Sequence, residues 1–202
     1  MNRPQDLFEA YQARDPLVVV EEWMIDADGV LPEPRAMALA TVSLSGSPSV
    51  RMVLLRGLDA RGFTWYTNFA SRKGSELLAT PVASLVVHHQ GFERQIRAEG
   101  PVVVVDNDEA DAYFASRPRG HQLSAWASSQ SQPLPLMHEL VEREAAASER
   151  YEGMEVPRPD YWGGFRLQPR VIELWQGRAN RMHDRIQFTR SDSGWFVERL
   201  QP

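Results

Sequence analysis

Short segments with alternating apolar and polar positions make up much of the chain after residue 36, and turns rich in Gly, Pro, Ser or Asp separate them. Alternation with a period of two is typical of β-strands, because successive side chains point to opposite faces. Turns as short as 45–48 and 59–62 favour antiparallel neighbours. The pattern predicts strands over 37–44, 50–56, 63–67, 82–88, 94–105, 166–174, 182–189 and 195–200, with a bulge or bend at Gly100-Pro101.

Helical signals interrupt this pattern at three places. Asp15-Pro16 combines an N-cap residue with a proline in the first turn and predicts an N-terminal helix over about 15–28. A short helix is predicted after Ser71, and a helical insertion is predicted over about 108–150. We therefore expect one α+β domain over residues 1–202, a closed or nearly closed antiparallel barrel with peripheral helices.

Composition narrows the classes of function. The 202 residues carry a formal net charge of -5, which argues against a general nucleic-acid or membrane-surface binder. The chain has no cysteine, so disulfides, thiolate metal sites and a cysteine nucleophile are excluded. Its first 15 residues are too polar for a signal peptide, and the apolar runs are too short to span a bilayer. A cytoplasmic protein is expected.

The segment Ser71-Arg72-Lys73 is the first candidate binding site. Ser71 has the character of an N-cap, yet the two residues that follow are cations, which the positive end of a helix dipole disfavours. Free backbone N–H groups, a hydroxyl and two cations together suit a phosphate group. The alternative is a surface turn whose cations point into water.

Two further groups of cations follow the same theme. The strand predicted over 50–56 is apolar on both faces, which is typical of a central strand, and Arg51 and Arg56 bound it. Either both arginines extend to solvent at the barrel rim or they add to an anion site. In the strand predicted over 182–189 and the residue before it, Arg181, His183 and Arg185 would share one face. That face is either solvated or turned toward an anionic ligand.

Other signatures are missing. The chain contains neither a G-x-G-x-x-G nor a G-x-x-x-x-G-K-[ST] motif, so classical dinucleotide and Walker-type sites are not supported. It also lacks H-E-x-x-H and any His/carboxylate spacing that suits a metal, so no metal is expected. What remains is a barrel whose cations suit a phosphorylated organic molecule, with aromatic residues such as Tyr66, Trp126 and Trp175 able to pack against a ring.

Several motifs, taken in order, make the chain resemble the pyridoxamine (pyridoxine) 5′-phosphate oxidase family. The resemblance runs from about residue 15 to the C-terminus. It is specific because the motifs occur together in register, although each alone is weak. They are Arg51-Met52-Val53-Leu54-Leu55-Arg56, Tyr66-Thr67-Asn68, Ser71-Arg72-Lys73, Glu93-Arg94-Gln95, Ser116-Arg117-Pro118-Arg119, Gln130-Ser131, Tyr161-Trp162-Gly163-Gly164-Phe165, Trp175-Gln176-Gly177, Arg181-Met182-His183-Asp184-Arg185 and the ending Trp195 to Pro202.

The resemblance implies an FMN-binding split β-barrel that forms a homodimer, with two flavin sites at the subunit interface. FMN would oxidise the 4′ carbon of pyridoxine or pyridoxamine 5′-phosphate to give pyridoxal 5′-phosphate. Dioxygen would reoxidise the flavin and yield hydrogen peroxide. The protein would hold the substrate carbon close to the flavin and tune the charge around it.

The same resemblance assigns roles to individual residues. Arg181 and His183 would lie against the substrate ring as the catalytic residues. The substrate phosphate would meet Arg56, Tyr113, Arg117 and His121. Cofactor-binding residues would be Arg51, Met52, Val53, Leu54, Leu55, Arg56, Tyr66, Thr67, Ser71, Arg72, Lys73, Gln95, Gln130, Ser131, Trp175 and Arg185.

The chain departs from the family pattern mainly in the substrate half. Arg56 stands where the family usually has Lys, His121 stands where it usually has Ser, and Met182 replaces a usual Leu. The short N-terminus carries no recognisable Arg-x-x-Tyr lid element. Two alternatives therefore stay open: a related flavin oxidase acting on another substrate, such as a ring acid of the phenazine type, and a non-catalytic binder of flavin or pyridoxal phosphate.

Overall fold

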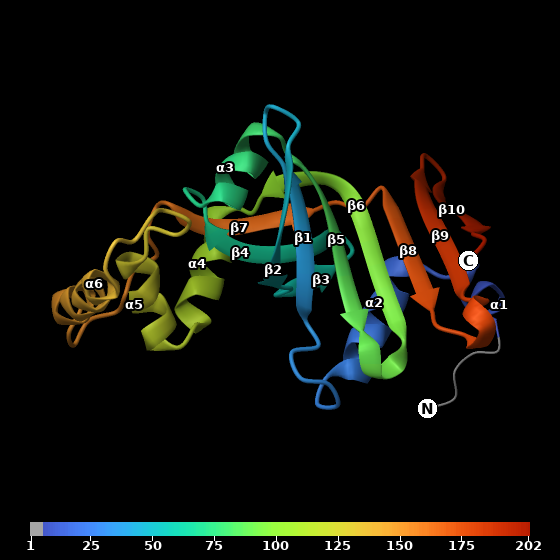
Figure 1. The fold of residues 1–202 in the computed structure, drawn as a ribbon, viewed down its shortest axis with the longest axis horizontal. Helices are drawn as coiled ribbons and strands as arrows, with labels where there is room; N and C mark the ends of the chain where they lie inside the picture. Colours follow the sequence, from blue (N-terminus) through green and yellow to red (C-terminus); the bar gives the residue numbers. More distant parts are fainter. Residues whose placement is uncertain (1–5) are drawn as a thin grey trace.

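Ten antiparallel strands form one strongly curled sheet in the computed structural model, which describes residues 6–202 (Figure 1). The strands are β1 (Ala36–Val42), β2 (Pro48–Leu54), β3 (Gly57–Asp59), β4 (Gly62–Asn68), β5 (Val82–His89), β6 (Arg94–Val104), β7 (Trp162–Leu167), β8 (Val171–Gln176), β9 (Asp184–Ser191) and β10 (Gly194–Arg199). The α-helices are α1 (Leu7–Tyr11), α2 (Pro16–Ala27), α3 (Arg72–Ala79), α4 (Asn107–Ser116), α5 (Arg119–Ala127) and α6 (Met137–Arg150), with short 3₁₀ turns η1 (Gln90–Phe92) and η2 (Ala179–Arg181). The predicted α+β class and antiparallel split barrel are confirmed.

A bend in β6 lets the sheet curl. The main path runs β10-β9-β8-β6-β5-β1-β2, while β3, β4 and β7 leave it. Residues 94–99 of β6 pair with β8, whereas residues 102–104 pair with β7. Gly100 lies between the two halves, where a Cβ atom would come within 2.2 Å of the Gln168 carbonyl oxygen. The bend predicted at Gly100-Pro101 therefore lies where the sheet changes its pairing partner.

The same bend corrects one prediction. The single strand predicted over 166–174 is wrong, because the chain turns between Leu167 and Val171 and forms β7 and β8 instead. Backbone hydrogen bonds of 2.9 Å from Gln168 N to Pro101 O and 2.8 Å from Arg170 N to Glu99 O hold this turn against the bend. The polar and proline residues Gln168-Pro169-Arg170 interrupt the apolar pattern at this turn, so the sequence does carry a signal for the break.

Helix α2 covers one face of the curled sheet. Asp15 caps it by accepting a 2.8 Å hydrogen bond from the Leu17 amide. Its buried side chains, including Trp23 and Met24, join the main core with strand residues such as Leu39 and Phe165. Burying large apolar side chains of this kind contributes about 1.5–3 kcal/mol each. The helix thereby seals one face of the barrel.

Strand β2 is an edge strand, contrary to the central position that its apolar middle favours. It pairs only with β1 in the described sheet. Val50 and Met52 are 68% and 63% exposed. An apolar edge with unpaired backbone groups is unusual on a monomer, because it invites contact with another chain.

Helices α4, α5 and α6 lie at one end of the molecule, and β8, β9 and β10 lie at the other (Figure 1). The helical end has its own apolar cluster, in which Phe114 and Leu123 pack with Trp162 of β7. The helices thus extend the fold beyond the barrel rather than covering it. Within residues 6–202, no helix is both long and apolar enough to cross a membrane.

Candidate active site

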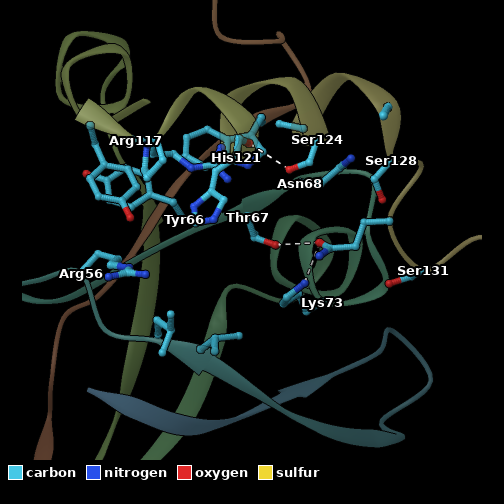
Figure 2. Close-up of a pocket in the computed structure, with 18 of the residues that line it drawn as sticks. Arg56, Tyr66, Thr67, Asn68, Lys73, Arg117, His121, Ser124, Ser128 and Ser131 are labelled. Atoms are coloured by element: carbon cyan, nitrogen blue, oxygen red, sulfur yellow. Dashed lines mark hydrogen bonds between the residues drawn. The ribbon is translucent and has the colours of Figure 1, made fainter. Parts of the chain in front are cut away.

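A cavity of about 1060 Å³ lies between the barrel and the helical end. Strands β2 and β4 and the start of α3 line its barrel side, and the C-terminal end of α4, together with α5 and the loop after it, lines the other. Figure 2 shows Arg56 and Lys73 on the barrel side, with Arg117 and His121 across from them. The lining residues include Arg51, Met52, Val53, Leu54, Arg56, Tyr66, Thr67, Asn68, Lys73, Tyr113, Ser116, Arg117, His121, Ser124, Ser128, Gln130, Ser131, Glu144 and Trp162.

The charge on this lining is strongly positive. The lining contains four cationic residues, Arg51, Arg56, Lys73 and Arg117. Glu144 is the single carboxylate residue among the described lining residues. Cations gathered in a partly buried space cost free energy unless acceptors or an anion meet them. The cavity is therefore suited to an anionic ligand, although the whole chain carries net negative charge.

Lys73 is the most deeply buried cation of the cavity. Ser71 caps α3 by accepting from the Gly74 amide, and the same hydroxyl accepts a 3.2 Å hydrogen bond from Lys73 Nζ. Lys73 also donates a 2.9 Å bond to Gln130 Oε1. No ion pair involving Lys73 occurs in the described part of the chain. Burial, followed by the nearby Arg51 charge, lowers the pKa of Lys73 to about 8.

Arg72, next to Lys73, points away from the helix and is 63% exposed. Its Nε donates a 2.9 Å bond to Glu76 one turn further along α3. Lys73 lies in the wall of the cavity, whereas Arg72 lies outside the cavity lining. Both cations therefore begin α3, but they face different surroundings.

An aromatic stack forms the wall near Arg117. The rings of Tyr66 and Tyr113 lie 3.9 Å apart and nearly parallel, and Trp162 stacks on Tyr66 at 5.6 Å. The guanidinium of Arg117 lies 4.7 Å from the Trp162 ring, as in a cation–π contact. Burial raises the pKa of Tyr66 to about 12, so its hydroxyl keeps its proton at neutral pH.

Arg117 lacks a partner for one of its buried donors. Its Nη1 is buried and has no hydrogen-bond acceptor among residues 6–202. Burial also lowers the pKa of Arg117, and the Arg56 charge lowers it further. A buried guanidinium donor left without an acceptor is costly. An anion in the cavity would supply that acceptor.

A second group of predicted residues forms a row across β6, β8 and β9. Gln95 pairs with Trp175, and Trp175 pairs with Arg185, in the antiparallel registers. Residues directly opposite each other share a face of a sheet. The His183 ring lies 4.7 Å from the Trp175 ring. We call Gln95, Trp175 and Arg185, together with His183 packed against Trp175, the strand row.

The strand predicted over 182–189 begins later than expected, which corrects the placement of Arg181 and His183. Arg181 ends the turn η2 with a φ of 61°, and β9 starts at Asp184. Arg178 closes the base of this turn with bonds of 2.9 and 2.6 Å to Asp184. Arg181 and His183 therefore do not share one strand face with Arg185, although all three lie in or beside the same turn.

The structure thus divides the predicted residues into two sets. Those from Arg51 to Leu54, with Arg56, Tyr66, Thr67, Lys73, Tyr113, Arg117, His121, Gln130 and Ser131, line the cavity. The strand row and Arg181 do not line the cavity. Strands β8 and β9 lie at the end of the molecule opposite to α5 and α6 (Figure 1). Leu55 is fully buried in the main core, so its side chain faces neither set. Ser71 is also fully buried, beneath Lys73.

Sequence reasoning missed two kinds of residue. Trp162 belongs to a motif of the family resemblance but has no role assigned by it, yet it supports the aromatic wall. Glu76 was not singled out, although an i, i+4 pairing with Arg72 is visible in the sequence. Neither type of residue carries a distinctive signal, because a tryptophan or a helical glutamate is more often structural.

Two family models match the chain and together cover most of it. Residues 26–149 match the model described as pyridoxamine 5′-phosphate oxidase. Residues 162–202 match the pyridoxine 5′-phosphate oxidase C-terminal dimerisation region. The first match contains the cavity residues apart from Trp162, and the second contains Trp175, Arg181, His183 and Arg185.

Individual proteins agree with these models. A pyridoxine/pyridoxamine 5′-phosphate oxidase of Acaryochloris marina is 48% identical over 99% of this chain and 92% of its own length. One from Paraburkholderia phytofirmans is 50% identical over 94% of this chain and 90% of its own. PhzG from Burkholderia lata, solved with tetrahydrophenazine-1-carboxylic acid, has a TM-score of 0.92 and 30% identity, and covers 100% of this chain and 98% of its own. An FMN-binding protein of Nostoc punctiforme shares the fold, with a TM-score of 0.76 at 17% identity over 94% of this chain and all of its own.

Proposed function

The chain belongs to the pyridoxamine 5′-phosphate oxidase family of oxidoreductases, and on that basis we propose that it oxidises pyridoxine or pyridoxamine 5′-phosphate to pyridoxal 5′-phosphate. The proposed cofactor is FMN, and the proposed electron acceptor is dioxygen, which leaves as hydrogen peroxide. The observation that carries this proposal is the cavity, whose cations and aromatic wall suit two phosphorylated ring compounds.

The barrel side of the cavity fits the phosphate end of FMN. Lys73 is buried, uses only neutral acceptors and lies beside the N-terminus of α3. Helix N-termini and lysine ammonium groups are common phosphate partners. We assign Lys73 to the FMN phosphate, with Arg72 at the same helix start. Residues Arg51 to Leu54 of β2 line the adjoining space and would face the flavin.

The helical side fits the phosphate of the substrate. Arg117 presents a buried Nη1 that needs an acceptor, and Tyr113 stands beside it. His121 is exposed on the same wall. We assign Arg117, Tyr113, Arg56 and His121 to this phosphate. Arginine binds phosphate oxygens in a forked geometry, so it orients the ester as well as holding it.

A partner subunit would complete the site. The strand row and Arg181 lie outside the cavity. Apart from Gln95, these residues belong to the part of the chain that matches a dimerisation region. The exposed apolar edge at β2 suits burial against a second copy. We propose a homodimer in which the cavity of one chain and the strand row of its partner enclose each active site.

The chain's own residues then act by positioning. FMN, when bound, supplies the two-electron acceptor. Arg117 and Tyr113 hold the substrate phosphate, which fixes the distance of the ring from the barrel wall. His183 of one subunit accepts a 3.2 Å hydrogen bond at Nδ1 from the Arg178 amide, so a neutral imidazole carries its proton on Nε2. That nitrogen can donate a hydrogen bond to the substrate ring, and Arg181 adds positive charge beside it.

A second candidate substrate is a reduced phenazine acid, because PhzG has nearly the same fold. Such an acid carries a carboxylate but no phosphate ester. A cavity with Arg117 and Arg56 on the substrate side is better suited to a phosphate dianion. Phosphate-dependent turnover separates the two candidates.

Purified protein should release FMN on denaturation, or bind added FMN. It should then convert pyridoxine 5′-phosphate to pyridoxal 5′-phosphate, with one peroxide formed for each product. Unphosphorylated pyridoxine serves as the control and should react far more slowly. If FMN binds but neither phosphorylated vitamer is oxidised, the substrate assignment is wrong, and the phenazine-type candidate should be tested next.

A further inference from the structure

A buried carboxylate lies behind the cations that begin α3. Glu76 is 7% exposed, and donors from three elements meet its two oxygens. Thr41 of β1 and Ser49 of β2 donate to Oε2 at 2.5 and 2.6 Å. Arg51 Nη2 approaches the same oxygen at 3.3 Å, while Arg72 Nε donates to Oε1 at 2.9 Å.

These contacts join two arginines through one anion. Burial alone would raise the pKa of Glu76, but hydrogen bonds from Ser49, Thr41 and Arg72 lower it to about 2. The carboxylate is therefore charged throughout the physiological range. A buried carboxylate saturated with donors in this way is a rigid anchor rather than a free anion.

We propose that Glu76 is a positioning residue that holds Arg72 in the orientation required by the FMN phosphate. This inference rests on the proposed function, because it takes the flavin phosphate to lie at the start of α3, within reach of both Lys73 in the cavity wall and Arg72 outside the cavity lining. Glu76 itself need not touch the flavin. Its oxygens face inward to β1 and β2, whereas Arg72 faces outward from the helix.

The position of the Arg72 side chain depends more strongly on Glu76 than the position of the Arg51 side chain does. Arg51 also donates to the Leu39 carbonyl at 3.0 Å and to the hydroxyls of Thr41 and Ser49, so it stays anchored without Glu76. Arg72 has Glu76 as its only side-chain partner in the described structure and is otherwise exposed. A freely moving arginine side chain loses conformational entropy when it binds the phosphate, and this cost weakens the contact.

The carboxylate also sets the local charge. Arg51, Arg72, Lys73 and Glu76 carry three positive charges and one negative charge. Their sum matches a phosphate monoester dianion. Removing Glu76 would increase the net positive charge that attracts the FMN phosphate, but it would also release the Arg72 side chain. A loss of FMN affinity would show that orientation of Arg72 dominates, and a gain would show that charge dominates.

The test is a double-mutant cycle on FMN binding to the apoprotein. Dissociation constants are measured by flavin fluorescence quenching for wild type, Glu76→Ala, Arg72→Ala and the double variant. Glu142→Gln on exposed α6 is the matched control, since it removes a carboxylate away from this network. Glu76→Gln keeps the size of the side chain and one acceptor oxygen, and replaces the alanine variant if that variant does not fold.

Orientation predicts that Glu76→Ala weakens FMN binding about three- to tenfold. In the Arg72→Ala background, the same change should have almost no further effect, because the residue that Glu76 orients is gone. Glu76→Gln should fall between wild type and Glu76→Ala, and Glu142→Gln should match wild type. If Glu76 served only to stabilise the fold, Glu76→Ala would weaken FMN binding by the same factor in wild type and in Arg72→Ala.

Two results would overturn the inference. One is equal or tighter FMN binding in both Glu76 variants, which would mean that charge outweighs orientation. The other is full additivity with Arg72→Ala. Failure of the proposed function is separate, since it would appear as absence of FMN binding in wild type and in Glu142→Gln.

Discussion

Lys73 Nζ lies 2.9 Å from Gln130 Oε1, which ties the first turn of α3 to the loop after α5. Thr67 of β4 donates to the same oxygen at 3.0 Å. One amide therefore connects both sides of the cavity beneath the proposed FMN phosphate (Figure 2). The lysine at this junction is partly desolvated, which makes its charge sensitive to pH.

FMN affinity should fall as the pH rises above 8. Burial and the Arg51 charge lower the pKa of Lys73 to about 8 in the ligand-free protein, so the ammonium group is lost above that pH. A bound phosphate would raise this pKa, so binding takes up a proton and weakens by up to about tenfold per pH unit. Titration of apoprotein with FMN between pH 7 and 10 measures the slope.

Lys73→Arg is the matched control for that slope, because its guanidinium stays charged across this range. Its FMN affinity should be nearly flat with pH. Parallel curves for wild type and Lys73→Arg would show that Lys73 is not the group that titrates.

Arg117→Met should impair turnover while sparing the flavin. The change removes a cation whose buried Nη1 awaits an acceptor, and it keeps the side chain's apolar volume. A lost charged hydrogen bond is worth about 1.5–3 kcal/mol, so kcat/KM for pyridoxine 5′-phosphate should fall about 10- to 100-fold. Steady-state kinetics and FMN titration measure the two effects separately.

Arg143→Met controls for the loss of an arginine. Arg143 lies on α6 and pairs with Glu139 at 3.2 Å, outside the cavity lining. Its kinetics should match wild type. A loss of FMN from Arg117→Met, with unchanged kcat/KM after reconstitution, would move Arg117 to the cofactor side.

A heterodimer of two impaired chains should regain activity. Arg117 lies in the cavity and Arg181 in the turn η2 at the other end of the chain, so we expect one active site to draw them from different subunits. A dimer of Arg117→Met with Arg181→Ala would hold one intact site and one doubly altered site. Its activity should be about half that of wild type.

Two affinity tags on co-expressed chains allow this heterodimer to be isolated. Each variant paired with itself is the control and should stay at its own low activity. If the mixed dimer is no more active than these homodimers, both residues serve the same chain's site, and the proposed shared site is wrong.

Gly100→Ala should destabilise the fold at the bend of β6. The added Cβ would lie 2.2 Å from the Gln168 carbonyl oxygen, and the turn that carries this oxygen is hydrogen-bonded to Pro101 and Glu99. Overpacking of this kind costs about 1–3 kcal/mol in the free energy of unfolding. Urea unfolding of wild type and variant at one protein concentration measures the difference.

Gly120→Ala is the opposite case. A Cβ at this position in α5 meets no atom within 4 Å, so the helix should be unchanged or gain about 0.5–1 kcal/mol. If both variants lost the same free energy of unfolding, the close approach of the Gln168 carbonyl oxygen would not be the reason that residue 100 must be glycine.

Much of the fold follows from local rules that the sequence states directly. The caps at Asp15 and Ser71 lie at the starts of α2 and α3, because side-chain oxygens satisfy the first amides of a helix wherever the helix packs. Alternation located most of the strands, since the strand period is a property of the backbone. The run of cations at Arg72 and Lys73 indicated a phosphate site because it contradicts the helix dipole.

Tertiary structure decided which elements meet. Alternation shows which side chains share a face but not which strand lies beside it, so the edge position of β2 was not visible. A turn with positive φ at Arg181 depends on the Arg178–Asp184 contact that closes its base. Glu76 acquires its four donors only when β1, β2 and α3 are assembled, because hydrogen bonds between distant segments leave no period in the sequence.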